Sequence, residues 1–360
     1  MRKKSIRFLL TLLLTAALLC GLLSGSAYLY DPQNVYRWNT RGVRCYQPTF
    51  SAAGALRHYD YDLAIIGSSM VQNWDAEALA DTLHCKPLKL TIGAMTPGEI
   101  LFLYNAAHQT GRAGRYIVNI DLHRIAAAEQ IAPDAGRFPK VMFHPTGISQ
   151  FRYLLGFETW FRFMPADLAC TAALHLPIPA SFRDKIAETS DINAMCAWDE
   201  STRPGTSALL HAWRTHEKAF NEGDNADFAR DPVRNVRVFS QQLAQQTVSN
   251  ETLTLVLPPY SILYWADKTP DQLQALLEMR QALGAFADAH PSVTLADFQS
   301  IAEINDLEQY VDANHCGAQI RLRVQNALAD GTFNADGAQT ARNNALLLQY
   351  LDAFHEQYGS

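Results

Sequence analysis

Two kinds of hydrophobic pattern alternate along most of this chain. Five short runs are almost wholly apolar and rich in Ile, Leu and Val, as expected for strands that are buried on both faces of a sheet. They cover residues 62–66, 87–92, 116–120, 253–257 and 292–296. The stretches between them are longer and place apolar residues at helical spacing. Strands that alternate with helices predict an α/β fold with a five-stranded parallel sheet.

Helix signals follow several of these strands. Thr96-Pro97-Gly98-Glu99 combines a capping residue, a proline at the first helical position and a glutamate at the third, which predicts a helix start. Further helices are expected over 71–79, 236–248, 270–290, 316–328 and 338–355. Together the elements fit a flavodoxin-like three-layer α/β/α sandwich, in which ligands bind at the carboxyl ends of the strands.

The first thirty residues carry a different pattern. An uncharged apolar run extends from Phe8 to about Tyr30, which is long enough to cross a bilayer core of about 30 Å as a helix. Four cations precede it, namely Arg2, Lys3, Lys4 and Arg7. The run exceeds the ~7–15 apolar residues of a signal peptide, so we favour an uncleaved single-pass anchor over a cleaved signal or a lipoprotein at Cys20. The cationic end should stay cytoplasmic, which leaves everything from Asp31 outside.

The sequence therefore predicts three parts: a membrane anchor over 1–30, a juxtamembrane connector over 31–59, and a catalytic domain over 60–360. Within that domain, residues 124–234 break the alternation of strands and helices. This region is rich in aromatic residues at first and polar around 198–205. We interpret it as a helical insertion that covers or flanks the site. Its aromatic side chains are interpreted as core rather than as a sugar-binding platform.

Composition narrows the function classes. The net charge of −6 includes the four N-terminal cations, so the exported part carries about −10 (−6 minus 4). An acidic domain without a basic cluster is a poor nucleic-acid binder. No Gly-x-Gly-x-x-Gly, Walker or Cys-x-x-Cys motif occurs, so neither a cofactor nor a metal is expected. Outside the cytoplasm the cysteines permit one or two disulfides, whose pairing the sequence leaves open.

A candidate nucleophile lies where the first strand ends, in Gly67-Ser68-Ser69-Met70. A hydroxyl between a parallel strand and a helix N-terminus is where α/β enzymes hold a nucleophile, because backbone N–H groups and the helix dipole stabilise negative charge there. Turns favour Gly and Ser in any case, so the segment alone also fits an ordinary turn.

The partner that such a serine needs occurs far downstream, in Asp312-Ala313-Asn314-His315. An aspartate three residues before a histidine in a loop can orient the imidazole and stabilise its protonated form. We interpret Ser69 as the nucleophile, His315 as the general base and Asp312 as the carboxylate that holds it. Ser68 is the alternative nucleophile, and Cys316 is interpreted as packing at a helix start.

The order of these motifs resembles the SGNH (GDSL-like) hydrolase superfamily, in which the serine follows the first strand and the Asp and His share a late block. Residues 61–73 look more like its membrane-anchored cell-envelope branch, which includes teichoic-acid D-alanylation proteins of the DltD type and alginate O-acetylation proteins. The resemblance covers about 62–125 and 236–328. It implies the SGNH hydrolase fold, with Ser69, Asp312 and His315 as the catalytic triad.

The resemblance also implies residues that line the site. Gly93 follows the second strand, where it would help the Ser69 N–H to bind an oxyanion, although a plain turn glycine fits equally. Asn119 would supply another donor or point into the sheet, and Asp121 is expected to line the site. The family's Gly-x-Asn-Asp block is replaced here by residues 118–121, Val-Asn-Ile-Asp. This departure fits the envelope branch better than a generic lipase.

These features predict extracytoplasmic acyl-ester chemistry on a cell-envelope polysaccharide or teichoic-acid-like acceptor, with O-acyl transfer preferred. One alternative is an esterase of the same fold that removes acyl groups. Another is a non-catalytic scaffold that assists a membrane-bound O-acyltransferase. The membrane, through the N-terminal helix, is the other expected partner.

Overall fold

The computed structural model describes residues 2–38, 42–195, 203–216, 227–247 and 250–359. The chain divides into two compact units, each built from two separate segments. The helical unit comprises Met1–Tyr59 and Arg137–Met195, and the sheet unit comprises Asp60–Gly136 and Cys196–Ser360. The expected insertion over 124–234 is therefore shared between them. Residues 124–136 and the described residues of 203–234 belong to the sheet unit.

Five parallel strands form the centre of the sheet unit. They are β1 (Leu63–Gly67), β2 (Pro87–Thr91), β3 (Arg115–Asn119), β4 (Thr252–Leu257) and β5 (Val293–Asp297). Their order is β2-β1-β3-β4-β5, and each lies within one residue of the predicted range. Side chains of the strands are buried on both faces, as their near-continuous apolar sequences predict. The α/β class and the five-stranded parallel sheet are thus confirmed.

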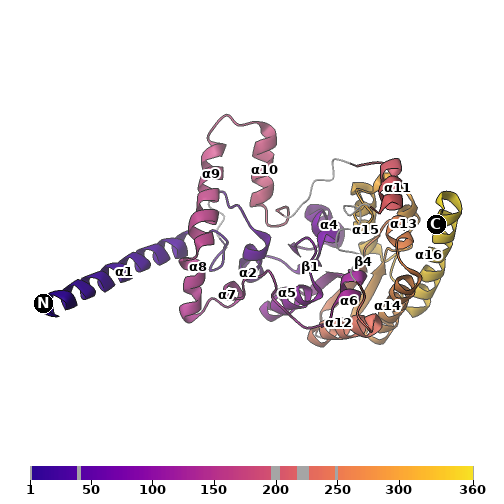
Figure 1. The fold of residues 1–360 in the computed structure, drawn as a ribbon, viewed down its shortest axis with the longest axis horizontal. Helices are drawn as coiled ribbons and strands as arrows, with labels where there is room; N and C mark the ends of the chain where they lie inside the picture. The colour runs from indigo at the N-terminus through magenta and orange to yellow at the C-terminus, as the bar shows by residue number, and fades with distance from the viewer. Residues whose placement is uncertain (1, 39–41, 196–202, 217–226, 248–249, 360) are drawn as a thin grey trace. The chain divides into compact units, whose positions relative to one another are not determined.

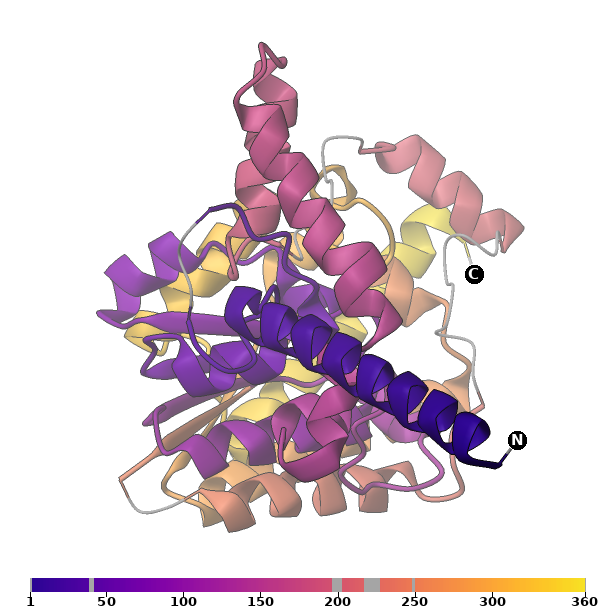
Figure 2. The ribbon, with the colours of Figure 1, turned by 90° about the vertical axis from the view of Figure 1, so that its left-hand side faces the viewer.

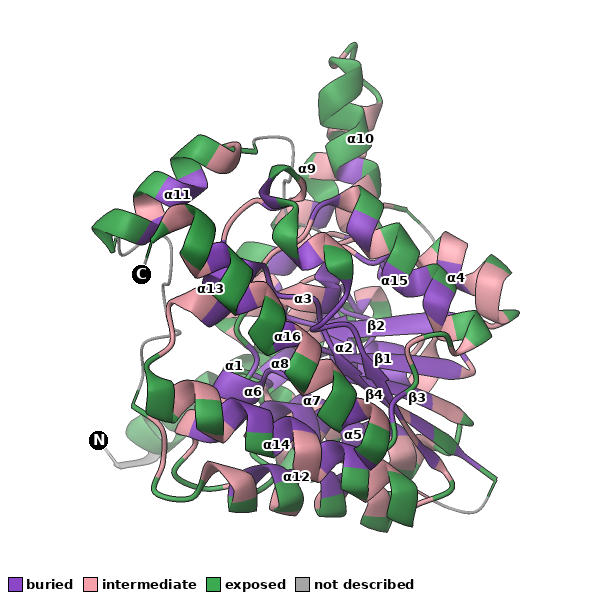
Figure 3. Cartoon of the chain, turned by 90° about the vertical axis from the view of Figure 1, so that its right-hand side faces the viewer, coloured by how far each residue is buried: buried purple, intermediate pink, exposed green. Residues whose placement is uncertain are grey.

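Helices cover both faces of this sheet (Figure 3). In chain order they are α3 (Ser69–Gln72), α4 (Ala76–Leu83), α5 (Pro97–Thr110), α6 (Leu122–Ala127), α11 (Thr206–Thr215), α12 (Pro232–Gln246), α13 (Ile262–Ala266), α14 (Pro270–Ala289), η4 (Ala302–Asn305), η5 (Leu307–Gln309), α15 (Ala318–Asp330) and α16 (Gly337–Tyr358). On one face of the sheet, α4 and α15 pack together near β2. On the other face, α12 packs between α5 and α14. The predicted capping box of α5 is present, with Thr96 and Glu99 bonded reciprocally.

The direction of the sheet changes at β1. The chain moves from β1 outward to β2, and then crosses back to β3 on the other side of β1. In register, Gly67 of β1 lies opposite Thr91 of β2, and Ile66 lies opposite Val118 of β3. The loops that leave these three strands therefore start side by side. Such a switch point is where open α/β sheets bind ligands.

The helical unit contains α1 (Arg2–Tyr30), α2 (Pro48–His58), α7 (Lys140–Phe143), η1 (Gly147–Gln150), α8 (Phe151–Leu154), the π-helical segment η2 (Glu158–Phe163), α9 (Met164–Leu174) and α10 (Ala180–Ser190). Its core joins the end of α1 to the second segment of the unit. The core residues are Ala27, Val35, Ala53, Met142, Tyr153 and Leu154. Helix α2 packs so closely on the turn after α1 that a Cβ at Gly54 would overlap the Asn34 carbonyl group.

Helix α1 projects from the rest of the helical unit, and its C-terminal end meets α8 (Figure 1). Residues Lys4–Tyr30 have a mean hydropathy of 2.3 over their most apolar window and are long and apolar enough to span a membrane. Up to Leu23 the described side chains of the helix are exposed, whereas Ser24 and Ala27 are buried in the unit. An exposed apolar helix of this length is what the sequence predicts for the anchor.

Candidate active site

Ser69 is held at the carboxyl end of β1 by a tight passage from strand to helix. At Gly67 a Cβ atom would lie 2.5 Å from the Cβ of Asn119, so the last strand position fits only glycine. Ser68 then caps α3, and its hydroxyl accepts a hydrogen bond from the Met70 N–H at 3.4 Å. Ser69 becomes the first residue of the helix and is half-buried at the sheet edge.

Two buried side chains hold the other end of α3. The Lys89 ammonium group on β2 donates to the carbonyl oxygens of Gln72 at 2.5 Å and of Trp74 at 2.9 Å. A cation is thereby placed at the negative end of the short helix. On α15, the Gln325 amide accepts from the Asp75 N–H at 3.3 Å and donates to the Asp75 carbonyl at 2.8 Å. Contacts from a strand and from a second helix therefore fix the turn behind the serine.

His315 and Asp312 lie in a loop that closes on itself. The Val311 N–H donates to the His315 carbonyl at 2.9 Å, and the Gly317 N–H donates to the Gln309 carbonyl at 2.6 Å. These two hydrogen bonds close the backbone of the loop that carries both residues. The loop can therefore hold a fixed geometry without belonging to a helix or strand.

Asp312, His315 and Ser69 form a continuous chain of hydrogen bonds. Asp312 Oδ1 accepts from the N–H groups of Asn314 at 2.7 Å and His315 at 2.8 Å. Its Oδ2 lies 2.7 Å from His315 Nδ1, and His315 Nε2 lies 2.8 Å from Ser69 Oγ. Because a carboxylate only accepts, Nδ1 carries the proton, and Nε2 is left to accept from the serine hydroxyl.

The electrostatics of Asp312 agree with this arrangement. Burial alone would raise the pKa of its carboxyl group. The hydrogen bonds and charge of His315, together with the backbone donors, outweigh burial and hold the pKa below its usual range. The carboxylate is therefore ionised at neutral pH and can stabilise a protonated imidazole.

A second set of hydrogen bonds links the serine turn to β3 and β4. Asn119 Oδ1 accepts from the Ser68 N–H at 3.3 Å and from the Ser68 hydroxyl at 3.0 Å. Asn119 Nδ2 donates to Asp121 Oδ1 at 3.0 Å, and the Tyr260 hydroxyl donates to the same oxygen at 2.9 Å. All four side chains are at most 4% exposed. Of the two orientations that the sequence left open for Asn119, the structure has the inward one, and Asp121 is a buried member of the same set.

The loop after β4 supports the loop that carries the histidine, and sequence reasoning did not identify its role. Ser261 donates to the Ala313 carbonyl through both its N–H, at 3.0 Å, and its hydroxyl, at 2.8 Å. The Tyr310 hydroxyl donates to the Pro259 carbonyl at 3.1 Å. The available signal was a Pro-Pro-Tyr-Ser segment directly after a strand, at the sheet edge where the serine was expected.

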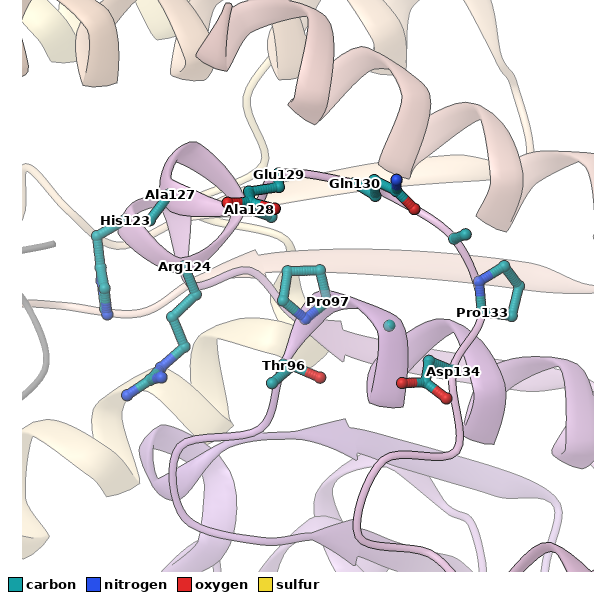
Figure 4. A pocket seen from close by; sticks show the side chains of 12 residues that line it. Thr96, Pro97, His123, Arg124, Ala127, Ala128, Glu129, Gln130, Pro133 and Asp134 are labelled. Carbon is teal, nitrogen blue, oxygen red and sulfur yellow. The ribbon is translucent and has the colours of Figure 1, made fainter. Parts of the chain in front are cut away.

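Gly93 leaves β2 beside the serine turn, and its surroundings are open. A Cβ at this position would meet only Gln72 Oε1, at 4.0 Å. Three residues further on, Thr96 forms part of the wall of a cavity of about 590 Å³. Figure 4 shows this cavity between the start of α5, the start of α6 with His123 and Arg124, and the 127–134 segment. Neither Ser69 nor His315 lines this cavity. Its walls come from segments that follow β2 and β3, the two strands on either side of β1.

Within the described part of the chain, no group of three or more His, Cys, Asp or Glu residues could hold a metal ion. The chemical groups that the arrangement brings together are the serine hydroxyl, the imidazole and the carboxylate. A histidine oriented by a carboxylate can take the serine proton and release the oxygen for attack on a carbonyl carbon. The sequence matches no known protein-family model, and no curated protein matches it.

Proposed function

We propose that this protein performs serine-dependent acyl-ester chemistry at the cell envelope, as an O-acyltransferase that modifies a glycan. The observation that carries the proposal is the hydrogen-bonded chain of Ser69, His315 and Asp312, with distances of 2.8 and 2.7 Å. We also propose that the sheet unit has the SGNH hydrolase fold. Its strand order matches the flavodoxin-like order, with the serine after β1 and the histidine loop after β5.

In the first half of the proposed reaction, an acyl ester is the donor. His315 Nε2 takes the hydroxyl proton while Ser69 Oγ attacks the ester carbonyl, and Asp312 stabilises the imidazolium that forms. The tetrahedral intermediate then collapses, its ester C–O bond breaks, and the imidazolium returns the proton to the leaving alcohol. An acyl-Ser69 intermediate remains, and His315 is neutral again.

In the second half, a hydroxyl group of the acceptor gives its proton to His315 and attacks the acyl-enzyme. The bond to Ser69 Oγ breaks, and the imidazolium protonates the serine. If water attacks in place of the sugar hydroxyl, the same steps give hydrolysis. Transfer therefore needs an acceptor that is bound and oriented close to the acyl-enzyme. The cavity bounded by Thr96, Arg124 and Asp134 offers room for such an acceptor along the same sheet edge.

The oxyanion would be held at the end of the sheet between β1 and β2. Ser69 opens a helix, and backbone N–H groups in a first helical turn point toward bound anions. Gly93 comes from the neighbouring strand and has no side chain to crowd the position. Asn119 is assigned a positioning role, because its amide is engaged with Ser68 and Asp121.

The proposed location of the chemistry rests on α1. The Lys4–Tyr30 helix would cross the membrane once, with the cationic end in the cytoplasm and the rest of the chain outside. An anchored enzyme of this kind would act on polymers close to the membrane surface.

Active-site labelling tests the proposal directly. A fluorophosphonate probe reacts with activated serines, so the wild-type chain should be labelled, and labelling should be lost in Ser69→Ala. Ser68→Ala is the matched control: it keeps the nucleophile and should keep the label. Undiminished labelling of Ser69→Ala would refute the assignment of the nucleophile.

The direction of the chemistry is tested on the glycan. Mass spectrometry of envelope polymers from a deletion strain should show fewer O-acyl esters than the wild type, and Ser69→Ala should fail to restore them. A gain of ester after deletion would instead indicate an esterase. Full restoration by Ser69→Ala would indicate a scaffold for another acyltransferase.

A further inference from the structure

The continuous segment α8–η2–α9 of the helical unit exposes large apolar side chains along one stretch. Those exposed are Phe151 (42%), Leu155 (36%), Phe157 (72%), Phe161 (71%) and Leu168 (58%). The rings of Phe157 and Phe161 stack on each other at 4.9 Å on the outside of the segment. Contiguous exposed apolar groups of this kind mark a surface that contacts a partner or a membrane.

Other side chains of the same segment are packed, and those of Thr159, Phe163 and Asp167 are buried. Two carbonyl groups that precede the π-helical turn accept hydrogen bonds from side chains within it. The Thr159 hydroxyl donates to the Tyr153 carbonyl at 2.6 Å, and the Trp160 indole N–H donates to the Leu154 carbonyl at 2.8 Å. Tyr153 and Leu154 remain in the core of the unit. The exposed phenylalanines therefore belong to a well-satisfied helix rather than to a frayed one.

The position of this segment relative to α1 identifies the partner. Ala27 of α1 packs in the same core as Tyr153 and Leu154 of α8. From Phe8, the first apolar residue after the cationic end, to Ala27 the helix rises about 30 Å, the thickness of a hydrocarbon core. The contact between α1 and α8 therefore lies at the outer boundary of the hydrocarbon.

Residues next to this boundary have the composition of a membrane interface. The Tyr28 ring packs on Tyr36 at 4.8 Å, and the Arg37 guanidinium lies 4.4 Å from the centre of the Tyr28 ring. Arg152 and Arg162 are exposed on the α8–η2–α9 segment itself. Aromatic rings and cations at the level where a helix leaves the hydrocarbon are typical of the headgroup region.

We propose that α8–η2–α9 lies in the outer interface of the bilayer that α1 crosses, with Phe157, Phe161 and Leu168 inserted among the acyl chains. Figure 1 shows the segment running across the end of α1, as a helix lying in the membrane surface would, and in Figure 2 α1 projects toward the viewer in front of it. This inference rests on the membrane-spanning role of α1 in the proposed function, but not on the serine chemistry. It makes the helical unit a second, non-spanning membrane contact.

Photo-crosslinking of the full chain in lipid nanodiscs tests the proposal. A benzophenone analogue of phenylalanine replaces Phe157 or Phe161, and the matched control carries it at Leu322, which is 43% exposed on α15 of the sheet unit. We expect roughly tenfold more lipid adduct from positions 157 and 161 than from position 322. Equal adduct from all three positions, or protein–protein adducts in place of lipid adducts, would overturn the proposal.

Two readouts separate this result from the proposed function. Retention of the full chain in membranes after alkaline carbonate extraction reports on α1, and release would overturn both the anchor and the interfacial helix. Fluorophosphonate labelling of Ser69 in each benzophenone variant reports on the fold of the sheet unit and on the serine chemistry. Failure of labelling in the wild type would leave the lipid-adduct result unchanged.

A separate observation in the helical unit concerns two cysteines. Cys45 Sγ and Cys170 Sγ lie 3.0 Å apart, although the residues are separated by 125 positions in the chain. The Cys45 N–H donates to Asp167 Oδ1 at 2.6 Å, and Asp167 lies one turn before Cys170 on α9. The geometry points to a disulfide between Cys45 and Cys170 that ties α9 to the segment after α1.

Formation of this bond outside the cytoplasm is a two-electron oxidation. A thiolate of the pair attacks the disulfide of an extracytoplasmic thiol oxidase and forms a mixed disulfide, which the second thiolate resolves. The two cysteines lose two protons and two electrons, and the oxidase is left as a dithiol. In the packed unit, burial and the contact with Cys170 raise the pKa of Cys45 to about 12.

Differential alkylation of the full chain tests this second proposal. Without a reductant, Cys45 and Cys170 should resist alkylation in denaturant and appear as one linked peptide in mass spectrometry, whereas Cys85 and Cys316 should be alkylated. Free Cys45 and Cys170 in chain purified under thiol-blocking conditions would overturn it. A topology reporter at the C-terminus shows separately whether the units face the oxidising side.

Discussion

Asp31 in the helical unit and Asp312 in the sheet unit both accept hydrogen bonds from backbone N–H groups a few residues ahead, yet their pKa values move in opposite directions. Asp31 is fully buried, and burial raises its pKa in spite of the donors around it. Asp312 is also desolvated, but His315 holds its pKa below the usual range. The difference is the partner, because one carboxylate faces neutral donors and the other faces an imidazole that can become a cation.

The two environments suit different tasks. Asp31 Oδ1 accepts from the Val35 N–H at 2.9 Å and from the Tyr153 hydroxyl at 3.0 Å. Its Oδ2 accepts from Tyr36 N–H at 2.8 Å and Arg37 N–H at 3.1 Å. All four acceptor sites serve to hold the turn after α1 against α8. One carboxylate oxygen of Asp312 instead accepts from backbone N–H groups of its loop, and the other accepts from His315. Asp312 therefore interacts with a group that can change its charge.

The largest effect is expected from Asp312→Asn. An amide at this position can donate to Nδ1 and stabilise the wrong tautomer of His315, so we expect hydrolysis of a small activated ester to fall by about 10³–10⁴-fold. The matched control is Asp306→Asn, since Asp306 only caps η5 through the Glu308 N–H. A comparable loss in both variants would mean that Asp312 acts through loop structure alone.

Asp31→Asn should instead affect stability. Asparagine tolerates the left-handed backbone at this position, where φ is +47°. It replaces one acceptor oxygen by a donor, however, and at either oxygen this donor faces at least one backbone N–H group. We expect a loss of about 2–4 kcal/mol, seen as faster hydrogen exchange in α2 and α8 of the full chain in nanodiscs. Fluorophosphonate labelling of Ser69 should persist. Loss of labelling with unchanged exchange would contradict the division of tasks.

Lowering the pH should change the stability of the two units in opposite directions. Burial, opposed by the Cys45 N–H and by Arg44, raises the pKa of Asp167 to about 6. A carboxyl group with a raised folded pKa adds stability below its unfolded pKa of about 4, and this stability is lost as the pH rises through 6. From pH 7 to pH 5 this carboxyl group should therefore add about 1 kcal/mol to the stability of the helical unit.

Asp312 contributes with the opposite sign. Its lowered pKa adds stability above about pH 4, which is lost as the pH falls further. Hydrogen exchange of both units at pH 7, 5 and 4 checks these directions. Asp167→Asn should reduce the gain of the helical unit between pH 7 and 5, and the raised pKa of Asp31 contributes to the part that remains. An unchanged gain in this variant would show that another group is responsible.

The smallest effect is expected from Tyr260→Phe, which removes the hydroxyl that donates to Asp121. The cost should be about 1 kcal/mol in unfolding free energy. Because Asp121 reaches Ser68 only through Asn119, esterase activity should fall only a few-fold. Asn119→Ala removes the link itself and should cost more in both measurements. Equal effects of the two variants would show that the hydrogen bonds do not act as a chain.

The strands could be predicted because they follow from local sequence, whereas the Ser69–His315 pairing joins residues 246 positions apart and was expected from the order of the two motifs. Apolar runs specify the strands, and a parallel sheet brings the ends of β1 and β5 to the same edge. The helical unit could not be predicted, since its two segments are far apart in sequence. Neither segment carries a repeat or motif that indicates packing against the other. The direction of the Asn119 side chain could not be predicted either. Successive side chains of a strand point to opposite faces, and this alternation holds only up to the residue where β3 ends.

The chain order of the two units has a consequence for biosynthesis. All residues of the helical unit exist once Met195 has been made, whereas β3 must wait for β4, whose first residue is Thr252. While the chain is being made, the helical unit can therefore complete its core at a stage when β3 still lacks its neighbour β4. Pairing over such a long separation is slow, and the exposed edge of β3 is most vulnerable to misfolding and proteolysis in that interval.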